Sequence, residues 1–115
     1  MKKEERLLLL KDLSARLPYN PMVHIHDLNT TDYENYLYAD DLDSMMSYSI
    51  RLKPYLRPMS SMTEEEKLMY EGLMIGTDNI SYMLDVIDWL NAHHFDYRGL
   101  IEKGLAIDAT NLNIY

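Results

Sequence analysis

LKPYLRPMSSMTEEEK, residues 52–67, divides the chain into an extended part and a helical part. Pro54 and Pro58 have no backbone N–H to donate, and a proline also disfavours helical geometry at the residue before it. Lys53 and Arg57 should therefore be extended. We predict that the extended backbone continues as far as Pro58.

The helical part begins with a capping box formed by Thr63 and Glu66. In this motif the Thr hydroxyl accepts the amide of Glu66, and the Glu carboxylate accepts the amide of Thr63. Residues 64–66 place three carboxylates in the first turn, where the helix dipole favours negative charge. A helix is predicted to begin at Thr63. Around this junction we expect burial of Tyr55, Leu56, Met59 and Met62, with Lys53 and Arg57 facing solvent or an acidic partner.

Before the junction, the pattern of apolar residues predicts a helix and then a strand. Leucines recur at helical spacing over residues 3–17, and Pro18 ends this helix. Apolar and polar residues alternate over residues 22–27, which predicts a strand. Residues 29–32 have the composition of a turn.

The next part of the chain is rich in tyrosine and has no clean period. Because Tyr and Ile favour a pleated surface, we predict two further strands, at residues 34–39 and 45–53. The alternative interpretation is a helix over residues 41–50, capped by Asp41 or Asp43.

After the junction, two helices are predicted. The first should end near Gly76, and the second should begin at Thr77 or Asp78 and end near His93 and His94. The second helix carries one apolar stripe at helical spacing, consisting of Ile80, Met83, Leu84, Ile87 and Leu90. A second apolar stripe lies beside it, at Tyr82, Val86 and Trp89. This doubly apolar helix is predicted to be the most buried element.

Residues 95–107 contain enough apolar side chains to dock on the core, as a short helix that ends at Gly104. Residues 108–115 are mostly polar and are expected to fray. Together these elements predict an α+β fold, with an N-terminal helix, a small antiparallel β-sheet in the middle, and a C-terminal helical pair packed on the sheet.

The length and composition limit the class of protein. A chain of 115 residues is long enough for one core, so we expect a single domain over residues 1–115. The absence of cysteine excludes a disulfide framework, a thiolate zinc site and a cysteine nucleophile, and it fits a reducing compartment. The leucine run near the start is too short for a signal peptide or a membrane span, so a cytoplasmic location is expected.

Negative charge is concentrated in the middle of the chain. Between Arg16 and Arg51 there are six Asp or Glu residues and no Lys or Arg, so this segment carries −6 of the formal charge of −8. Such a charge opposes binding to the phosphates of nucleic acids or to acidic lipids. We therefore expect no direct nucleic-acid or membrane partner. The expected partner is a protein, either one with a basic surface or a second copy in a homodimer.

The favoured site is the tyrosine- and acid-rich segment at residues 32–43. Tyrosine offers rigid contact area with a polar tip, and the carboxylates would attract a basic partner. The predicted partner-binding residues are Tyr33, Glu34, Tyr36, Tyr38, Asp40, Asp41 and Asp43. The alternative is that the tyrosines pack in the core and the acids form a solvated face. The predicted function is that of a non-catalytic interaction protein.

The four histidines offer an alternative function. His24 and His26 share one face of the predicted strand, and His93 and His94 lie at a helix end. If the fold joined the two pairs, they could bind zinc or another divalent ion and activate a water for hydrolysis. No metal-binding spacing such as HExxH supports this, and no phosphate-binding loop or serine elbow occurs. An enzyme is therefore the less favoured class, and no cofactor is expected.

Three blocks of the chain resemble a group of small proteins from gut Bacteroides-type bacteria, their phages and their mobile elements. The blocks are residues 5–19, residues 53–66, and residues 93–106 with HHFDYRGLI and KGLA. The resemblance implies a cytoplasmic, phage-related accessory protein, and it carries no activity, ligand or catalytic residue. That group often has a glycine-containing, strand-rich middle region, whereas residues 21–71 here are tyrosine-rich and contain no glycine. A shared binding surface in the middle of the chain is therefore not implied.

Overall fold

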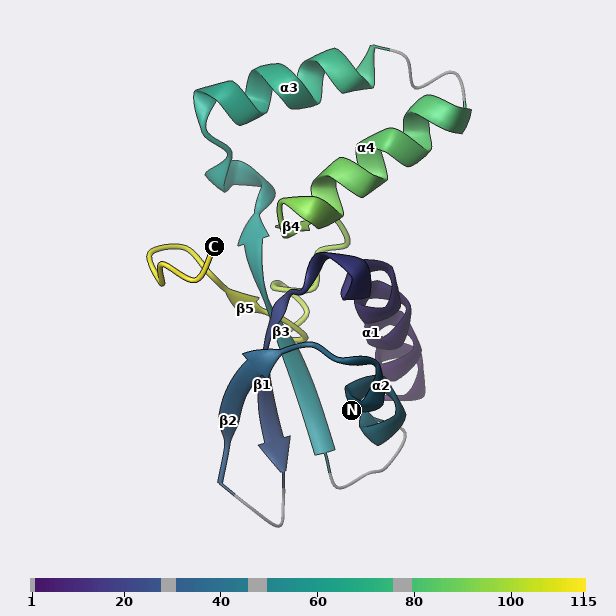
Figure 1. Cartoon of the computed structure of the whole chain (residues 1–115), viewed down its shortest axis with the longest axis vertical. Coiled ribbons are helices and arrows are strands. Elements are labelled where there is room, and N and C mark those ends of the chain that lie inside the picture. Colours follow the sequence, from purple (N-terminus) through teal and green to yellow (C-terminus); the bar gives the residue numbers. More distant parts are fainter. Residues whose placement is uncertain (1, 28–30, 46–49, 76–79) are drawn as a thin grey trace.

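A sheet runs through the middle of the molecule, with helices beside it and at one end (Figure 1). The structure is a computed structural model, and it describes residues 2–27, 31–45, 50–75 and 80–115. The helices are α1 (Lys3–Arg16), α2 (Ala39–Met45), α3 (Glu64–Met74) and α4 (Ile80–Ala92). This arrangement confirms the predicted α+β fold with its N-terminal helix and C-terminal helical pair. Among the described residues, no helix is long and apolar enough to cross a membrane.

The sheet is mixed rather than purely antiparallel. Its strands are β1 (Met22–Asp27), β2 (Tyr33–Tyr36), β3 (Ile50–Pro58), β4 (Phe95–Asp96) and β5 (Ile107–Asp108). β2, β1 and β3 are antiparallel in that order, as predicted. The short strands β4 and β5 pair in parallel with the second half of β3. β2 therefore lies at one end of the sheet.

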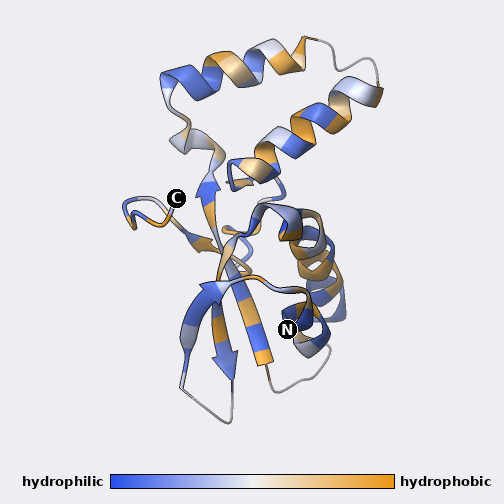
Figure 2. Ribbon diagram, viewed as in Figure 1, coloured by the Kyte–Doolittle hydropathy of each residue, from blue (hydrophilic) through white to orange (hydrophobic). Residues whose placement is uncertain are grey.

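One face of the sheet is covered by α1 and α2, and the other is open. Strands alternate their side chains between the two faces. The covered face buries Val23 and Ile25 of β1 and Leu52 of β3 against Leu9 and Leu13 of α1. This alternation appears as orange and blue bands along β3 (Figure 2). The polar side chains of the same strands, including the histidines of β1, lie on the open face.

The junction between the extended and helical parts is as predicted. β3 continues to Pro58, and Thr63 caps α3. The Thr63 hydroxyl accepts the amide of Glu66 at 3.1 Å, and the Glu66 carboxylate accepts the amide of Thr63 at 2.9 Å. Proline geometry and a capping box are sufficient to predict this junction, because each of these signals acts within a few residues.

The prediction for residues 34–53 is wrong in its middle part. β2 covers Tyr33–Tyr36, and helix α2 occupies residues 39–45, where the end of one strand, a connection and the start of the next strand were predicted. The carboxylate of Asp41 accepts the amide of Tyr38 at 2.8 Å, which supports the helix start, and Met45 is buried against the core. The rival helix interpretation was closer, although it placed the helix too late. Residues 46–49 lie outside the described residues, as do the predicted helix boundary at 76–78 and the first half of the predicted turn at 29–32.

The prediction that the second C-terminal helix is the most buried element is wrong. In α4 only Val86, Leu90 and Asn91 are buried. Val86 and Leu90 pack with Met62 and Phe95 in a second, smaller core cluster beneath the helical pair. The first half of α4 and most of α3 extend beyond this cluster, away from the sheet (Figure 1).

The last part of the chain also differs from the prediction. Residues 100–104 form turns rather than a short helix, and Gly99 and Gly104 beside and within them adopt left-handed φ angles of 70° and 73°. The carboxylate of Asp96 holds the first turn by accepting the amides of Leu100 and Ile101. The final residue, which was expected to fray, is docked: the Tyr115 hydroxyl donates to the carbonyl of Tyr55 at 2.7 Å.

Candidate functional site

The strand β2 forms the outer edge of the sheet, and it contains three of the predicted partner-binding residues, Tyr33, Glu34 and Tyr36. Its inner edge pairs with β1, and the amide of Leu37 continues that pairing by donating to the carbonyl of Pro21. Because backbone groups alternate between the two edges of a strand, Glu34 and Tyr36 turn their N–H and C=O groups outward. The amide of Tyr36 donates a hydrogen bond to the side-chain oxygen of Asn35 at 2.8 Å.

The predicted tyrosines are exposed rather than buried. Tyr33, Tyr36 and Tyr38 are 49%, 50% and 58% exposed, so the alternative that placed them in the core does not hold. Their faces differ, because Tyr36 stands opposite Met22 on the open face and Tyr33 stands opposite Ile25 on the covered face. The tyrosines therefore flank the outer edge of β2 from both sides instead of forming one flat surface.

The predicted acidic residues follow the same edge into α2. Asp40 and Asp41 lie in the first turn of α2, where Asp41 also accepts the amide of Tyr38, and Asp43 is exposed one turn later. Glu34 lies on the open face, where its carboxylate accepts the hydroxyl of Tyr55 at 2.6 Å. Burial, with the neighbouring Glu34 carboxylate, raises the pKa of Tyr55 to about 12. We call these seven residues, from Tyr33 to Asp43, the acidic tyrosine surface.

On the open face, Asp32 joins the two histidines of β1. Its carboxylate lies 2.6 Å from Nδ1 of His26 and 3.3 Å from Nε2 of His24. The hydrogen bond with His26 lowers the pKa of Asp32. A depression of about 380 Å³ beside them is also lined by Arg51 and Lys53. Positive and negative groups therefore alternate on the open face, and the excess negative charge lies toward β2 and α2.

The other two histidines have separate surroundings. His93 lies against Trp89, whose carbonyl is 2.9 Å from its Nδ1. His94 stacks on Tyr115, with ring centroids 3.7 Å apart. Within the part of the chain that the structure describes, no group of three or more His, Asp or Glu side chains could hold a metal ion. The geometry thus offers no support for the predicted metal alternative.

Arg57 was predicted to face solvent or an acidic partner, but it instead binds a carboxylate of its own chain. Its guanidinium forms two hydrogen bonds with the Glu66 carboxylate, at 2.6 and 2.8 Å, and lies 4.2 Å from the ring centre of Phe95. The hydrogen bonds from Arg57 lower the pKa of Glu66 to about 2. The same capping carboxylate that starts α3 therefore also ties the helix to β3.

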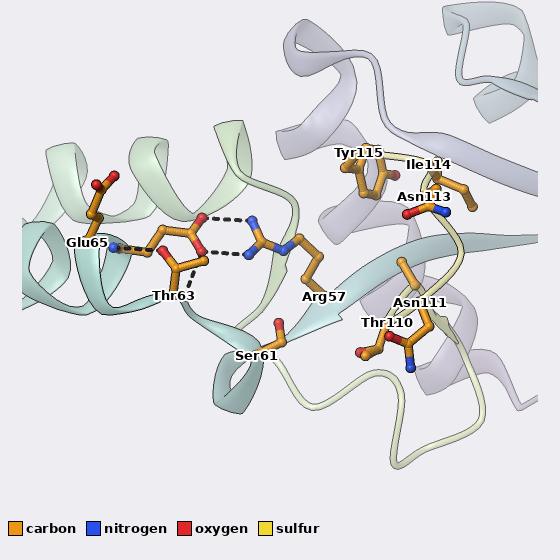
Figure 3. Close-up of a pocket in the computed structure, with 11 residues that line it drawn as sticks. Arg57, Ser61, Thr63, Glu65, Thr110, Asn111, Asn113, Ile114 and Tyr115 are labelled. Atoms are coloured by element: carbon orange, nitrogen blue, oxygen red, sulfur yellow. Dashed lines mark hydrogen bonds and ion pairs between the residues drawn. The ribbon is translucent and has the colours of Figure 1, made fainter.

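This ion pair lines one side of a cavity of about 520 Å³ (Figure 3). Arg57, Ser61 and Thr63 lie on one side, and the C-terminal loop with Thr110, Asn111 and Asn113 lies on the other. Among the described residues that line it, Arg57 is the single cation, and Glu66 already neutralises it. The described lining of the cavity therefore has no uncompensated positive charge with which to bind an anion.

A buried polar cluster joins α1 to the segment after α4, and sequence reasoning missed it. Arg16 is fully buried, and it binds Asp12 at 2.8 Å and the carbonyl of Phe95 at 2.7 Å. Arg98 reaches the same carboxylate of Asp12. The 12/16 spacing of opposite charges was visible in the sequence, but it is equally typical of a solvated helix face. This cluster connects the two cores and has a structural role.

Comparison with protein-family models, with curated proteins and with solved structures found no match for this chain. The resemblance to small proteins of gut Bacteroides-type bacteria and their phages therefore stays a prediction.

Proposed function

We propose that the protein is a non-catalytic interaction module that binds an extended, basic segment of another protein along the outer edge of β2. The observation that carries this proposal is the position of the half-exposed tyrosines on both sides of a terminal strand. An added strand would pair with the outward N–H and C=O of Glu34 and with the outward C=O of Tyr36, whose N–H is bound by the side chain of Asn35. The tyrosine rings would then cover its side chains on either face.

The negative charge of the acidic tyrosine surface favours a partner segment that is basic. The acidic tyrosine surface carries four carboxylates and contains no Lys or Arg. A second copy of the same edge would bring like charges together, whereas lysine or arginine on a partner strand would be attracted. A basic segment is therefore favoured over self-pairing at this edge.

Calorimetric titration with two defined peptides tests the proposal. One peptide alternates lysine with threonine, and the other alternates glutamate with threonine. We expect the protein to bind the lysine peptide and not the glutamate peptide, and to bind the lysine peptide more weakly as the salt concentration is raised. Tyr36→Ala should weaken this binding about tenfold, which corresponds to about 1.4 kcal/mol. Tyr82→Ala is the matched control, because Tyr82 on α4 is 52% exposed and distant from β2 in the fold.

A second pair of variants tests the strand geometry. Glu34→Pro removes an outward N–H without touching the pairing with β1, and Glu34→Gln removes only the charge. We expect Glu34→Pro to abolish binding and Glu34→Gln to weaken it. Equal binding of both peptides, or no effect of Tyr36→Ala and Glu34→Pro, would contradict the proposal.

A further inference from the structure

The open face of the sheet carries four basic side chains in a square beside Asp32. In the register of β1 with β3, His24 stands opposite Lys53, and His26 stands opposite Arg51. Residues two apart on a strand share a face, and side chains directly opposite each other have Cβ atoms about 5 Å apart. The depression of about 380 Å³ that Asp32 also lines lies among these four residues. We call them the basic square.

The basic square is an unfavourable arrangement for the protein alone. Like charges directly opposite one another on a sheet are destabilising. Arg51 and Lys53 are exposed, and among the described residues neither side chain forms an ion pair. Asp32 is the single carboxylate among the described residues that line the depression, and it is bound to His26 at 2.6 Å and to His24 at 3.3 Å. Two cations beside the depression therefore have no carboxylate in contact with them within the described chain.

The histidines make the charge of the square depend on pH. Histidine is the side chain that ordinarily takes up a proton between pH 8 and 5. The charged and titratable groups near the two rings are Asp32 and Glu34 on the side of β2, and Arg51, Lys53 and the Tyr55 hydroxyl on the side of β3. The hydrogen bond with His26 lowers the pKa of Asp32, so this carboxylate stays charged over that range. Two carboxylates and two cations balance, so each proton on a histidine adds one uncompensated positive charge.

We propose that the basic square binds the phosphate group of a small phosphate monoester, and that it binds this group more tightly at acidic pH. The site is separate from the outer edge of β2. The Arg51 guanidinium offers parallel N–H donors to two phosphate oxygens, and the Lys53 ammonium adds a point charge. Nδ1 of His26 is occupied by Asp32, so its Nε2 is the atom that donates to the phosphate when the ring is protonated. Donors on several sides of one point suit a tetrahedral oxyanion better than a planar carboxylate.

The size and surroundings of the depression favour a small ligand over a polymer. Its volume of about 380 Å³ lies at the lower end of the range for small-molecule sites, roughly 300–1,000 Å³. Ile107 of β5 also lines it and offers an apolar contact for the carbon part of the monoester. The acidic tyrosine surface, which includes part of the neighbouring strand β2, would repel a longer polyanion such as a nucleic acid.

NMR titration of the ¹⁵N-labelled protein with sodium sulfate, inorganic phosphate, phenyl phosphate and acetate tests the proposal, with the ionic strength held constant by sodium chloride. Sulfate keeps both of its charges at pH 5.5 and at pH 7.5, so a change in its affinity reports groups of the protein. We expect saturable shifts at the amides of residues 24, 26, 51 and 53, and an affinity for sulfate about fivefold higher at pH 5.5. Phenyl phosphate should bind more tightly than inorganic phosphate, because its ring contacts Ile107, and acetate should bind most weakly.

Three substitutions separate the basic square from general effects of charge. Arg51→Gln should lower the affinity for sulfate about tenfold, and Lys53→Gln repeats the test if Arg51→Gln does not fold, as checked by circular dichroism. Lys11→Gln is the matched control, because Lys11 is exposed on α1, which covers the opposite face of the sheet. The double variant His24→Gln/His26→Gln should keep the affinity at pH 7.5 and lose the increase at pH 5.5.

Several results would overturn the proposal. One is a set of shifts that does not saturate, and another is an equal loss of affinity in Arg51→Gln and Lys11→Gln. Acetate that binds as tightly as sulfate, or phenyl phosphate that binds no more tightly than inorganic phosphate, would contradict the assigned ligand. An unchanged pH dependence in the double histidine variant would contradict the role of the histidines.

Discussion

Arg57 connects three segments that are separate in the sequence. Its side chain binds Glu66 at the start of α3, its amide donates to the carbonyl of His94, and its guanidinium covers the ring of Phe95. Ion pairs on open surfaces contribute little, but this one is bidentate and mostly buried. Arg57 therefore holds the helical pair to the end of β3.

The Glu66→Gln variant should distinguish the contribution of the ion pair to stability from that of the helix cap. The amide side chain can still accept the Thr63 amide, but it carries no charge. We expect a loss of about 1–3 kcal/mol in the free energy of unfolding, measured by urea denaturation at pH 7. Because the folded-state pKa of Glu66 is lowered to about 2, the ion pair stabilises the protein fully above pH 4.5, and this contribution is lost as the pH falls toward 2. That pH dependence should disappear in Glu66→Gln and persist in the control Glu65→Gln.

His94 should make stability depend on pH in a different range. Burial, with the neighbouring Arg16, lowers the pKa of His94 from 6.5 to about 4. The unfolded chain therefore binds a proton before the folded chain does, so stability should fall as the pH drops from 6.5 to about 4. The loss should be roughly 1–3 kcal/mol, less than the full shift implies because solvent reaches part of the ring. His94 has a φ of 62°, which asparagine tolerates, so His94→Asn should remove this dependence in urea denaturation at several pH values. An unchanged slope in this variant would contradict the assignment.

At the scale of elements, α4 shows that an apolar pattern does not identify which side of a helix is buried. Leu84 and Leu90 belong to the same predicted stripe, yet they are 57% and 4% exposed. The pattern has apolar residues over more than half of the helix surface. Only the contact with α3 and Phe95 selects the buried side.

The two leucines give a matched test of this difference. Leu90→Ala should lower the free energy of unfolding by about 2–5 kcal/mol, because it leaves a cavity in the second core cluster. Leu84→Ala should change it by less than about 0.5 kcal/mol. The measurement is urea denaturation at a protein concentration where light scattering shows a monomer. Equal losses of unfolding free energy in the two variants would mean that Leu84, like Leu90, is buried within one chain.

At the scale of the whole molecule, two apolar clusters are joined by the Asp12–Arg16–Arg98 cluster. The larger lies between α1 and the sheet, and the smaller lies beneath α3–α4. The distal part of the helical pair has few buried contacts, and local opening costs least in such regions.

Hydrogen exchange followed by mass spectrometry should show this difference. We expect the amides of α1, β1 and β3 to exchange slowest and those of residues 80–85 to exchange much faster in the monomer. Uniform protection at low concentration would contradict the division into two parts.

The sequence alone determined the elements whose signals are local. Proline geometry predicted the extended end of β3, a capping box predicted the start of α3, and leucine spacing predicted α1, because each signal acts among residues a few positions apart. The partner-binding residues predicted between Tyr33 and Asp43 stay a prediction, and the structure adds that β2 is an edge strand with tyrosines on both faces.

Tertiary structure decided everything that depends on distant segments. Three contacts depend on it: the ion pair of Arg57 with Glu66, the hydrogen bond of Arg16 with Phe95, and that of Tyr115 with Tyr55. The last two join residues that are 79 and 60 positions apart in the sequence. Tertiary structure also decided which side of α4 is covered. Burial is a property of how separate elements meet, and neither residue spacing nor composition contains that geometry.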